Sequence, residues 1–180
     1  MSQSSASTAL SLLLSLAVSA GLNAQTAPDL SDPEVAHVAV TANTIDIELG
    51  RLAQARASNK DVRQFATTMA TDHAVVNQRA AALAAKLNVT PKDNAVSQSL
   101  LKGAAEARKT IEPLKDGAFD RAYMDREVAY HQAVLDALDG LLIPTTTNAE
   151  LKTLLTEVRG AIAAHQQYAK QVRAGLGAGK

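Results

Sequence analysis

Apolar residues recur every three or four positions along most of the chain, the spacing that places side chains on one face of an α-helix. Five segments follow this pattern, at about residues 31–58, 59–87, 95–111, 116–142 and 147–172. Helix-capping residues such as Ser31 and Asn148 open them, and Pro91, Pro113 and Pro144 lie in the gaps between them. No segment alternates between apolar and polar with a period of two, so we expect no β-strand.

The lengths and order of these helices predict how they pack. Four are long, and the shorter helix at 95–111 comes between the second and third long ones. The first two and the last two long helices are joined by short loops, so each pair should form an antiparallel hairpin, with the shorter helix carrying the chain across. This is the ferritin-like arrangement of a four-helix bundle. We therefore predict an all-α, ferritin-like bundle for residues 31–174.

The first 28 residues carry no charged side chain, and all 36 formal charges follow from Asp29 onward. Residues 9–18 form an apolar run shorter than the roughly 20 residues that span a bilayer. Small residues follow it, so we predict a signal peptide at 1–24 cut after Ala24, a linker at 25–30 and export to the periplasm or medium. An uncleaved anchor or a buried N-terminal helix is the less favoured interpretation. The glycine-rich residues 175–180 should form a flexible tail.

Charge and composition exclude several classes of function. Lysine and arginine number 18, as do aspartate and glutamate, and no basic block stands out, so nucleic-acid binding is not expected. The absence of cysteine excludes disulfides, thiolate metal sites and a cysteine nucleophile. The sequence contains no second hydrophobic run, so we do not expect an integral membrane span. No catalytic motif or phosphate-binding loop is recognisable either.

Three of the four histidines, His73, His131 and His165, each lie near the middle of a different long helix, within its apolar stripe. A helix midpoint falls in the same layer of a bundle whichever way the helix runs, so the three rings should meet in the core. An inward imidazole without hydrogen bonds costs about 1–3 kcal/mol. One metal ion would satisfy all three, since neutral imidazole is a common metal ligand. Carboxylates that could complete the site are Asp46 or Glu48 on the first long helix and Glu127, one turn before His131.

The alternative interpretation is a structural network in which the same histidines are paired with Asp46, Glu48, Glu127 or Tyr168. Buried networks of this kind fix the register of helix bundles, and the sequence leaves the two possibilities open. We interpret His37, near the start of the first long helix, as an ordinary, partly exposed residue.

Two motifs resemble a known family. They are Met69-x-x-Asp72-His73 and Phe119-Asp120-x-x-Tyr123, within a likeness that runs from about Ser31 to Val172. The chain resembles a bacterial domain-of-unknown-function family of secreted, ferritin-like helical proteins, often labelled "predicted outer membrane protein". The resemblance implies a ferritin-like fold and export but no established activity. It also implies a site at His73, His131 and His165 with an acidic residue, Asp46 or Glu48.

The chain departs from the di-iron members of the ferritin-like class, which use Glu-x-x-His motifs. Ala70, Val128 and Ile162 stand three residues before the three histidines. A histidine-rich site for one ion favours zinc, copper or nickel over paired iron. We therefore expect an exported metal-binding bundle that serves sequestration or stress protection. The alternative is a non-enzymatic envelope or stress-associated interaction module whose histidines are structural.

Overall fold

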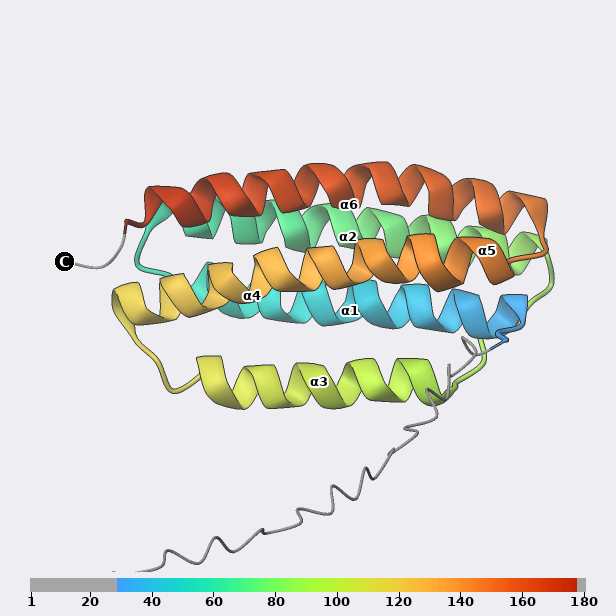
Figure 1. Cartoon of the computed structure of the whole chain (residues 1–180), viewed down its shortest axis with the longest axis horizontal. Helices are drawn as coiled ribbons and strands as arrows, with labels where there is room; N and C mark the ends of the chain where they lie inside the picture. The colour runs from blue at the N-terminus through green and yellow to red at the C-terminus, as the bar shows by residue number, and fades with distance from the viewer. Residues whose placement is uncertain (1–28, 178–180) are drawn as a thin grey trace, which may run out of the picture.

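The computed structural model describes residues 29–177, which form a bundle of parallel and antiparallel helices (Figure 1). The long helices are α1 (Asp32–Arg56), α2 (Lys60–Lys86), α4 (Asp116–Ala137) and α6 (Ala149–Gly175). Between α2 and α4 comes the shorter α3 (Ala95–Ile111). The chain continues from α4 through a π-helical segment, η1 (Leu138–Leu142), and the short α5 (Ile143–Thr145). No strand occurs in the described part, which confirms the predicted all-α bundle.

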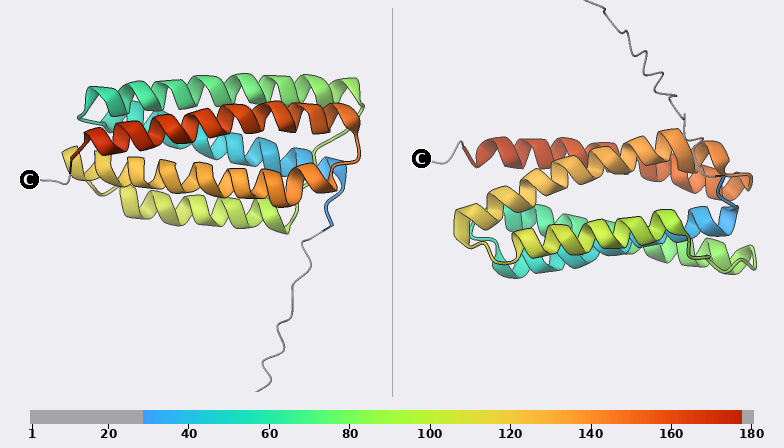
Figure 2. Two further views of the ribbon diagram at one scale, coloured as in Figure 1. Left: turned by 45° about the horizontal axis from the view of Figure 1, so that its top comes forward. Right: turned by 60° about the horizontal axis from the view of Figure 1, so that its bottom comes forward.

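The order of the helices also agrees with the prediction. The pairs α1–α2 and α4–α6 are antiparallel hairpins, and α3 runs back along the outside of the bundle against α1 and α4 (Figure 2). None of the helices between residues 29 and 177 is both long and apolar enough to cross a membrane. The predicted signal peptide at 1–24 lies outside the described residues, as do most of the linker and the last three residues of the tail.

Local hydrogen bonds explain where the helices begin. Ser31 and Glu34 form the predicted capping box at the start of α1. The side chain of Asn59 accepts hydrogen bonds from the backbone of Asp61 and Val62, and Asn148 caps α6 in the same way. These caps depend only on residues close in sequence, which is why the predicted starts of the helices lie within two residues of the observed ones.

The apolar core has two parts, one toward each end of the bundle. One contains the large side chains of Phe65, Met69, Phe119, Tyr123 and Met124. The other consists of aliphatic residues from α1, α4, η1 and α6 (Val35, Val38, Leu135, Leu138, Leu142, Leu154, Leu155 and Val158). The predicted histidine level lies between them along the helices, so its polar atoms are enclosed by hydrocarbon from both ends.

Candidate metal centre

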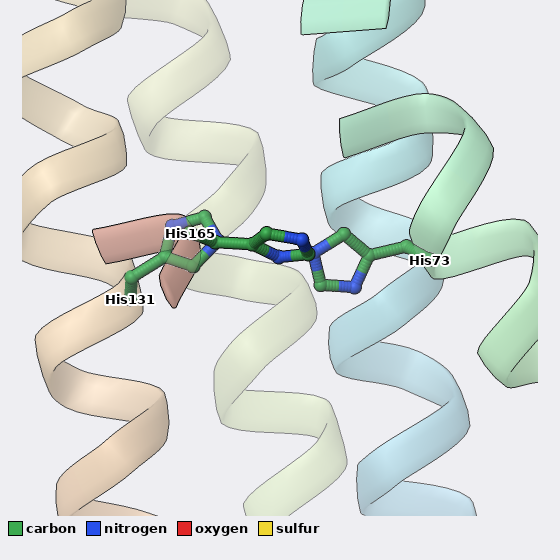
Figure 3. A group of neighbouring side chains, drawn as sticks. All are labelled: His73, His131 and His165. Atoms are coloured by element: carbon green, nitrogen blue, oxygen red, sulfur yellow. The ribbon is translucent and has the colours of Figure 1, made fainter. Parts of the chain in front are cut away.

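The structure brings His73 of α2, His131 of α4 and His165 of α6 together in one layer at mid-bundle (Figure 3). We call these three residues the histidine layer. Their ring centroids lie 5.3–5.9 Å apart, and one ligand nitrogen of each falls within 4.8 Å of the other two. The side chains of His73 and His131 are 4% and 1% exposed, whereas 12% of the His165 side chain is exposed. The layer is therefore buried, with His165 at its solvent edge.

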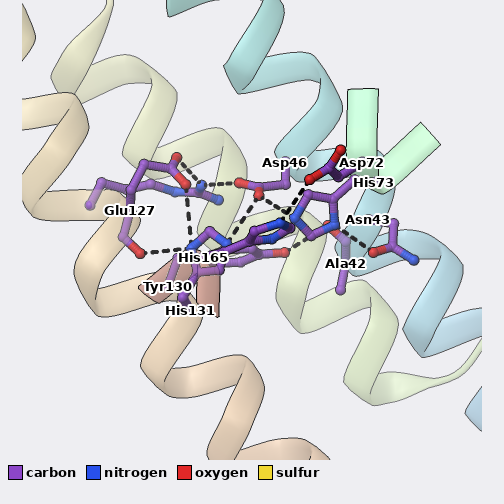
Figure 4. Close-up of polar contacts among 10 residues, drawn as sticks. Ala42, Asn43, Asp46, Asp72, His73, Glu127, Tyr130, His131 and His165 are labelled. Carbon is purple, nitrogen blue, oxygen red and sulfur yellow. Dashed lines mark hydrogen bonds and ion pairs between the residues drawn. The ribbon is translucent and has the colours of Figure 1, made fainter. Parts of the chain in front are cut away.

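Each imidazole has one nitrogen bonded to an oxygen that faces away from the other rings. The Nδ1 atoms of His73 and His131 lie 2.7 Å from the Asn43 side-chain oxygen and 2.9 Å from the Glu127 backbone carbonyl (Figure 4). The Nε2 atom of His165 lies 3.1 Å from a carboxylate oxygen of Asp72. All three partners are acceptors, so the ring proton belongs on these nitrogens. The other nitrogen of each neutral ring then carries a lone pair.

Those other nitrogens are the unusual feature of the site. Within the described residues, His73 Nε2, His131 Nε2 and His165 Nδ1 are buried and have no hydrogen-bond partner. Asp46 Oδ2, on α1, is also without one, and it lies 2.9 Å from His73 Nε2 and 3.6 Å from His131 Nε2. Buried polar atoms without partners are rare because each costs about 1–3 kcal/mol. Four helices thus each supply one unsatisfied electron-pair donor to the same region.

A fixed cation holds the carboxylate of Asp46 from its other side. Arg126 Nη1 donates to Asp46 Oδ1 at 2.8 Å and to Glu127 Oε1 at 2.6 Å, and its guanidinium lies 3.8 Å from the Tyr130 ring centroid. Burial alone would raise the pKa of Asp46, but the close approach of His73 and the charge of Arg126 outweigh it, so that this pKa lies well below its usual range. Asp46 is therefore ionised and available as a ligand.

At His131, His165 and Glu127 the effect of burial on the pKa outweighs that of the nearby charges and hydrogen bonds. It lowers the pKa of His131 to about 4 and also lowers the pKa of His165. Burial, reinforced by the charge of Asp46, raises the pKa of Glu127 well above its usual value. Burial therefore favours neutral imidazoles at His131 and His165 at neutral pH, which is the state in which histidine binds metals.

The structure separates the carboxylates that the sequence left as alternatives. Asp46 is fully buried at the histidine layer, whereas Glu48 is exposed, because two residues along a helix differ by about 200° in direction. The prediction that Glu48 could join the site is therefore wrong for this arrangement. Glu127 is buried, but its carboxylate binds Arg126 and lies 3.5 Å from His131 Nδ1, the nitrogen that faces away from the layer.

Two participants were missed in the sequence. Asn43 lies one turn before Asp46 on α1, so the spacing alone could have placed it on the same helix face as Asp46. Arg126 gave no such indication, since a charged residue between polar neighbours is typical of an exposed face. Asp72 stands beside His73 in the motif Met69-x-x-Asp72-His73, yet its carboxylate binds His165 on a different helix.

Comparison with known proteins gives one match. The sequence profile of the family DUF4142, a domain of unknown function, matches residues 17–172. No curated protein and no solved structure matches the chain significantly.

Proposed function

The chain belongs to the DUF4142 family, a domain of unknown function, and we propose that it binds one transition-metal ion through the histidine layer and Asp46. The observation that carries this proposal is the set of four buried, unpartnered donor atoms contributed by four different helices. A divalent cation held by the three imidazoles would satisfy all four if Asp46, which already lies 2.9 Å from His73 Nε2 and 3.6 Å from His131 Nε2, completed the ligand set. The outer hydrogen bonds to Asn43, Glu127 and Asp72 already hold the rings in the tautomers that metal binding needs.

The donor set supports zinc, copper or nickel. Three imidazoles and one carboxylate are ligands of intermediate softness, and zinc is often held by three histidines with a fourth ligand. The ligand nitrogens lie within 4.8 Å of one another. Metal–nitrogen bonds of about 2.0–2.1 Å would require the three ring nitrogens to draw closer together.

The proposed role is metal sequestration or protection against metal stress outside the cytoplasm. The charge-free N-terminal segment with its short apolar run supports export to the periplasm or medium. A site enclosed within a bundle suits tight retention of an ion, because outer hydrogen bonds already hold the three rings in orientation.

The experiment is a metal titration of chelator-treated full-length protein, with melting temperature and bound metal as readouts. We expect one ion per chain and a stabilisation of about 2.7 kcal/mol when free metal is 100-fold above the dissociation constant. His165→Gln, at the edge of the layer, should remove this stabilisation. His37→Gln is the matched control, because His37 is a partly exposed histidine of α1 that lies near Asp93, away from the layer. Stabilisation that persists in His165→Gln, His131→Asn and Asp46→Asn alike would refute the proposal.

One observation favours a second candidate, a structural network without metal. The 2.9 Å contact between His73 and Asp46 also suits an ion pair in which His73 carries a second proton. In that case purified protein binds no stoichiometric metal, and Asp46→Asn lowers the free energy of unfolding equally with and without added metal.

A further inference from the structure

A cavity of about 470 Å³ lies inside the bundle and ends at the histidine layer. All four long helices and η1 line it, and His73 and His131 form its inner end. The opposite end reaches the level where α1 begins, α2 ends and α6 begins, at the same end of the bundle in Figure 1. Thr90 and Ala85 line the cavity there and are exposed, so the cavity communicates with solvent. Its volume falls within the range of about 300–1,000 Å³ typical of small-molecule sites.

The cavity is long and narrow. Its lining on α1 extends from Asp32 to Asn43, eleven positions or about 16 Å at 1.5 Å per residue. On α2 it extends from His73 to Leu87, fourteen positions or about 21 Å. A shape of this kind accommodates one extended chain better than a compact molecule.

The walls of the cavity are aliphatic. Small side chains such as Ala39, Ala80 and Ala84 stand where larger ones would fill the space, and leucines and valines of η1 and α6 face them. Leu138 and Leu142 come from the π-helical segment, a local widening that is frequent at functional sites. Native cores rarely leave this much apolar volume unfilled, since cavities reduce stability.

The polar groups of the cavity are concentrated at its inner end. No lysine or arginine lines it in the described structure, and Asp32, at the open end, is bound to Thr147 and Asn148. At the inner end, Asn77 joins His73 and His131. The amide of Asn77 donates to Thr44 Oγ1, which fixes its orientation and leaves Oδ1 buried without a donor among the described residues. A ligand is therefore recognised by its chain along the walls and by a hydrogen-bonding head at the histidines.

We propose that this cavity binds a single-chain aliphatic alcohol or acid, with the chain along the apolar walls and the oxygen-bearing head at His73, His131 and Asn77. The inference rests on the proposed function in one respect, namely that the head group also contacts the bound metal ion. A hydroxyl head can donate to Asn77 Oδ1 and offer its oxygen to the ion, whereas a carboxylate offers only oxygen. The alcohol and the acid carry the same aliphatic chain, and the experiment distinguishes which head group the protein binds.

The test is calorimetric titration of the zinc-loaded, full-length protein with 1-decanol and with decanoate. Ala80→Phe places a ring in the cavity, and Ala82→Phe is the matched control, because Ala82 is exposed on the same helix and does not line the cavity. We expect one ligand per chain, at least tenfold weaker binding in Ala80→Phe, and binding within twofold of wild type in Ala82→Phe. Zinc affinity should be unchanged in both variants. The inference is overturned if neither ligand binds, or if the two variants bind the ligand equally well.

Cobalt in place of zinc tests the head group separately. Addition of the bound amphiphile to cobalt-loaded protein should change the visible absorption of the ion, because its ligand environment changes. If the amphiphile binds and the spectrum stays constant, the placement of the head at the metal is wrong. If the amphiphile binds to a protein that takes up neither zinc nor cobalt, the proposed function fails while the chain-binding site stands. If metal binds and no amphiphile does, only the cavity inference fails.

Discussion

Acid should destabilise the chelator-treated protein through His131. Its side chain is 1% exposed, and burial lowers its pKa to about 4, whereas an unfolded chain titrates histidine near 6.5. Below pH 6.5 the unfolded state therefore binds a proton that the folded state does not bind until the pH approaches 4. His131 therefore makes its full contribution to the free energy of unfolding above pH 6.5, and this contribution is lost as the pH falls from 6.5 to about 4.

The magnitude follows from the shift. A difference of about 2.5 pKa units corresponds to roughly 3.4 kcal/mol in full, of which about 2 kcal/mol is lost by pH 5. Other groups contribute in the same range of pH. The lowered pKa of His165 acts in the same direction, whereas the raised pKa of Glu127 stabilises the fold as the pH falls. The contribution of Asp46, whose pKa is lowered, is retained down to about pH 4.

A comparison with His131→Asn isolates the effect of the one imidazole. Asparagine retains a donor for the Glu127 carbonyl but does not titrate. We expect urea unfolding, followed by far-UV circular dichroism, to show that wild type loses about 2 kcal/mol more than the variant between pH 8 and pH 5. Parallel pH profiles for the two proteins would refute the argument that His131 is held neutral by burial.

Four further substitutions test the surroundings of the site and the glycines of α1 and α3. Asp72→Ala removes the acceptor that orients His165, and competition titration should show metal affinity about 10–100-fold weaker; unchanged affinity would mean that the orientation is fixed otherwise. Arg126→Met leaves the buried side chains of Asp46 and Glu127 without their cation, and urea unfolding should show a free energy of unfolding about 3–5 kcal/mol lower. A decrease below about 1 kcal/mol would contradict this role of Arg126. Gly50→Ala places a methyl carbon 3.0 Å from the Ala66 carbonyl oxygen and should lower the free energy of unfolding by about 1–3 kcal/mol. Gly103→Ala adds a methyl group with nothing within 4 Å, and thermal unfolding should show a stabilisation of up to about 1 kcal/mol.

The sequence predicted the helices and the histidine layer because both depend on local information. The capping box at Ser31 and Glu34 acts within four residues, and the position of a histidine at a helix midpoint is a matter of counting. Which of Asp46 and Glu48 faces the histidine layer is decided by contacts between helices, not by the local sequence. Helix α1 contacts α2, α3 and α4, so buried residues occur on several of its sides and no single stripe indicates which carboxylate faces inward.

The cavity and the buried arginine depend on relations between distant helices. Alanines such as Ala80 leave space only because the residues opposite them on α6 do not reach across, which helix periodicity does not show. Arg126 is covered by α3, whose alanines and Gly103 lie beside it in a shallow depression. The ferritin-like resemblance and the export of the protein stay predictions, because no solved structure matches and the N-terminal segment lies outside the described residues.

Arg126 also explains why the site suits one ion rather than two. Asp46, Glu127 and His131 also bring potential ligand atoms within 4.8 Å of one another, as a second metal position would. The guanidinium donates to Asp46 Oδ1 and Glu127 Oε1, and His131 donates its Nδ1 proton to the Glu127 carbonyl, so one polar atom of each of these side chains already has a protein partner. The positive charge that a second ion would bring is thus built into the chain. Because Arg126 holds Asp46 Oδ1, the remaining oxygen of this carboxylate is directed toward the histidines, so the contact that disfavours a second ion also orients the ligand proposed for the first.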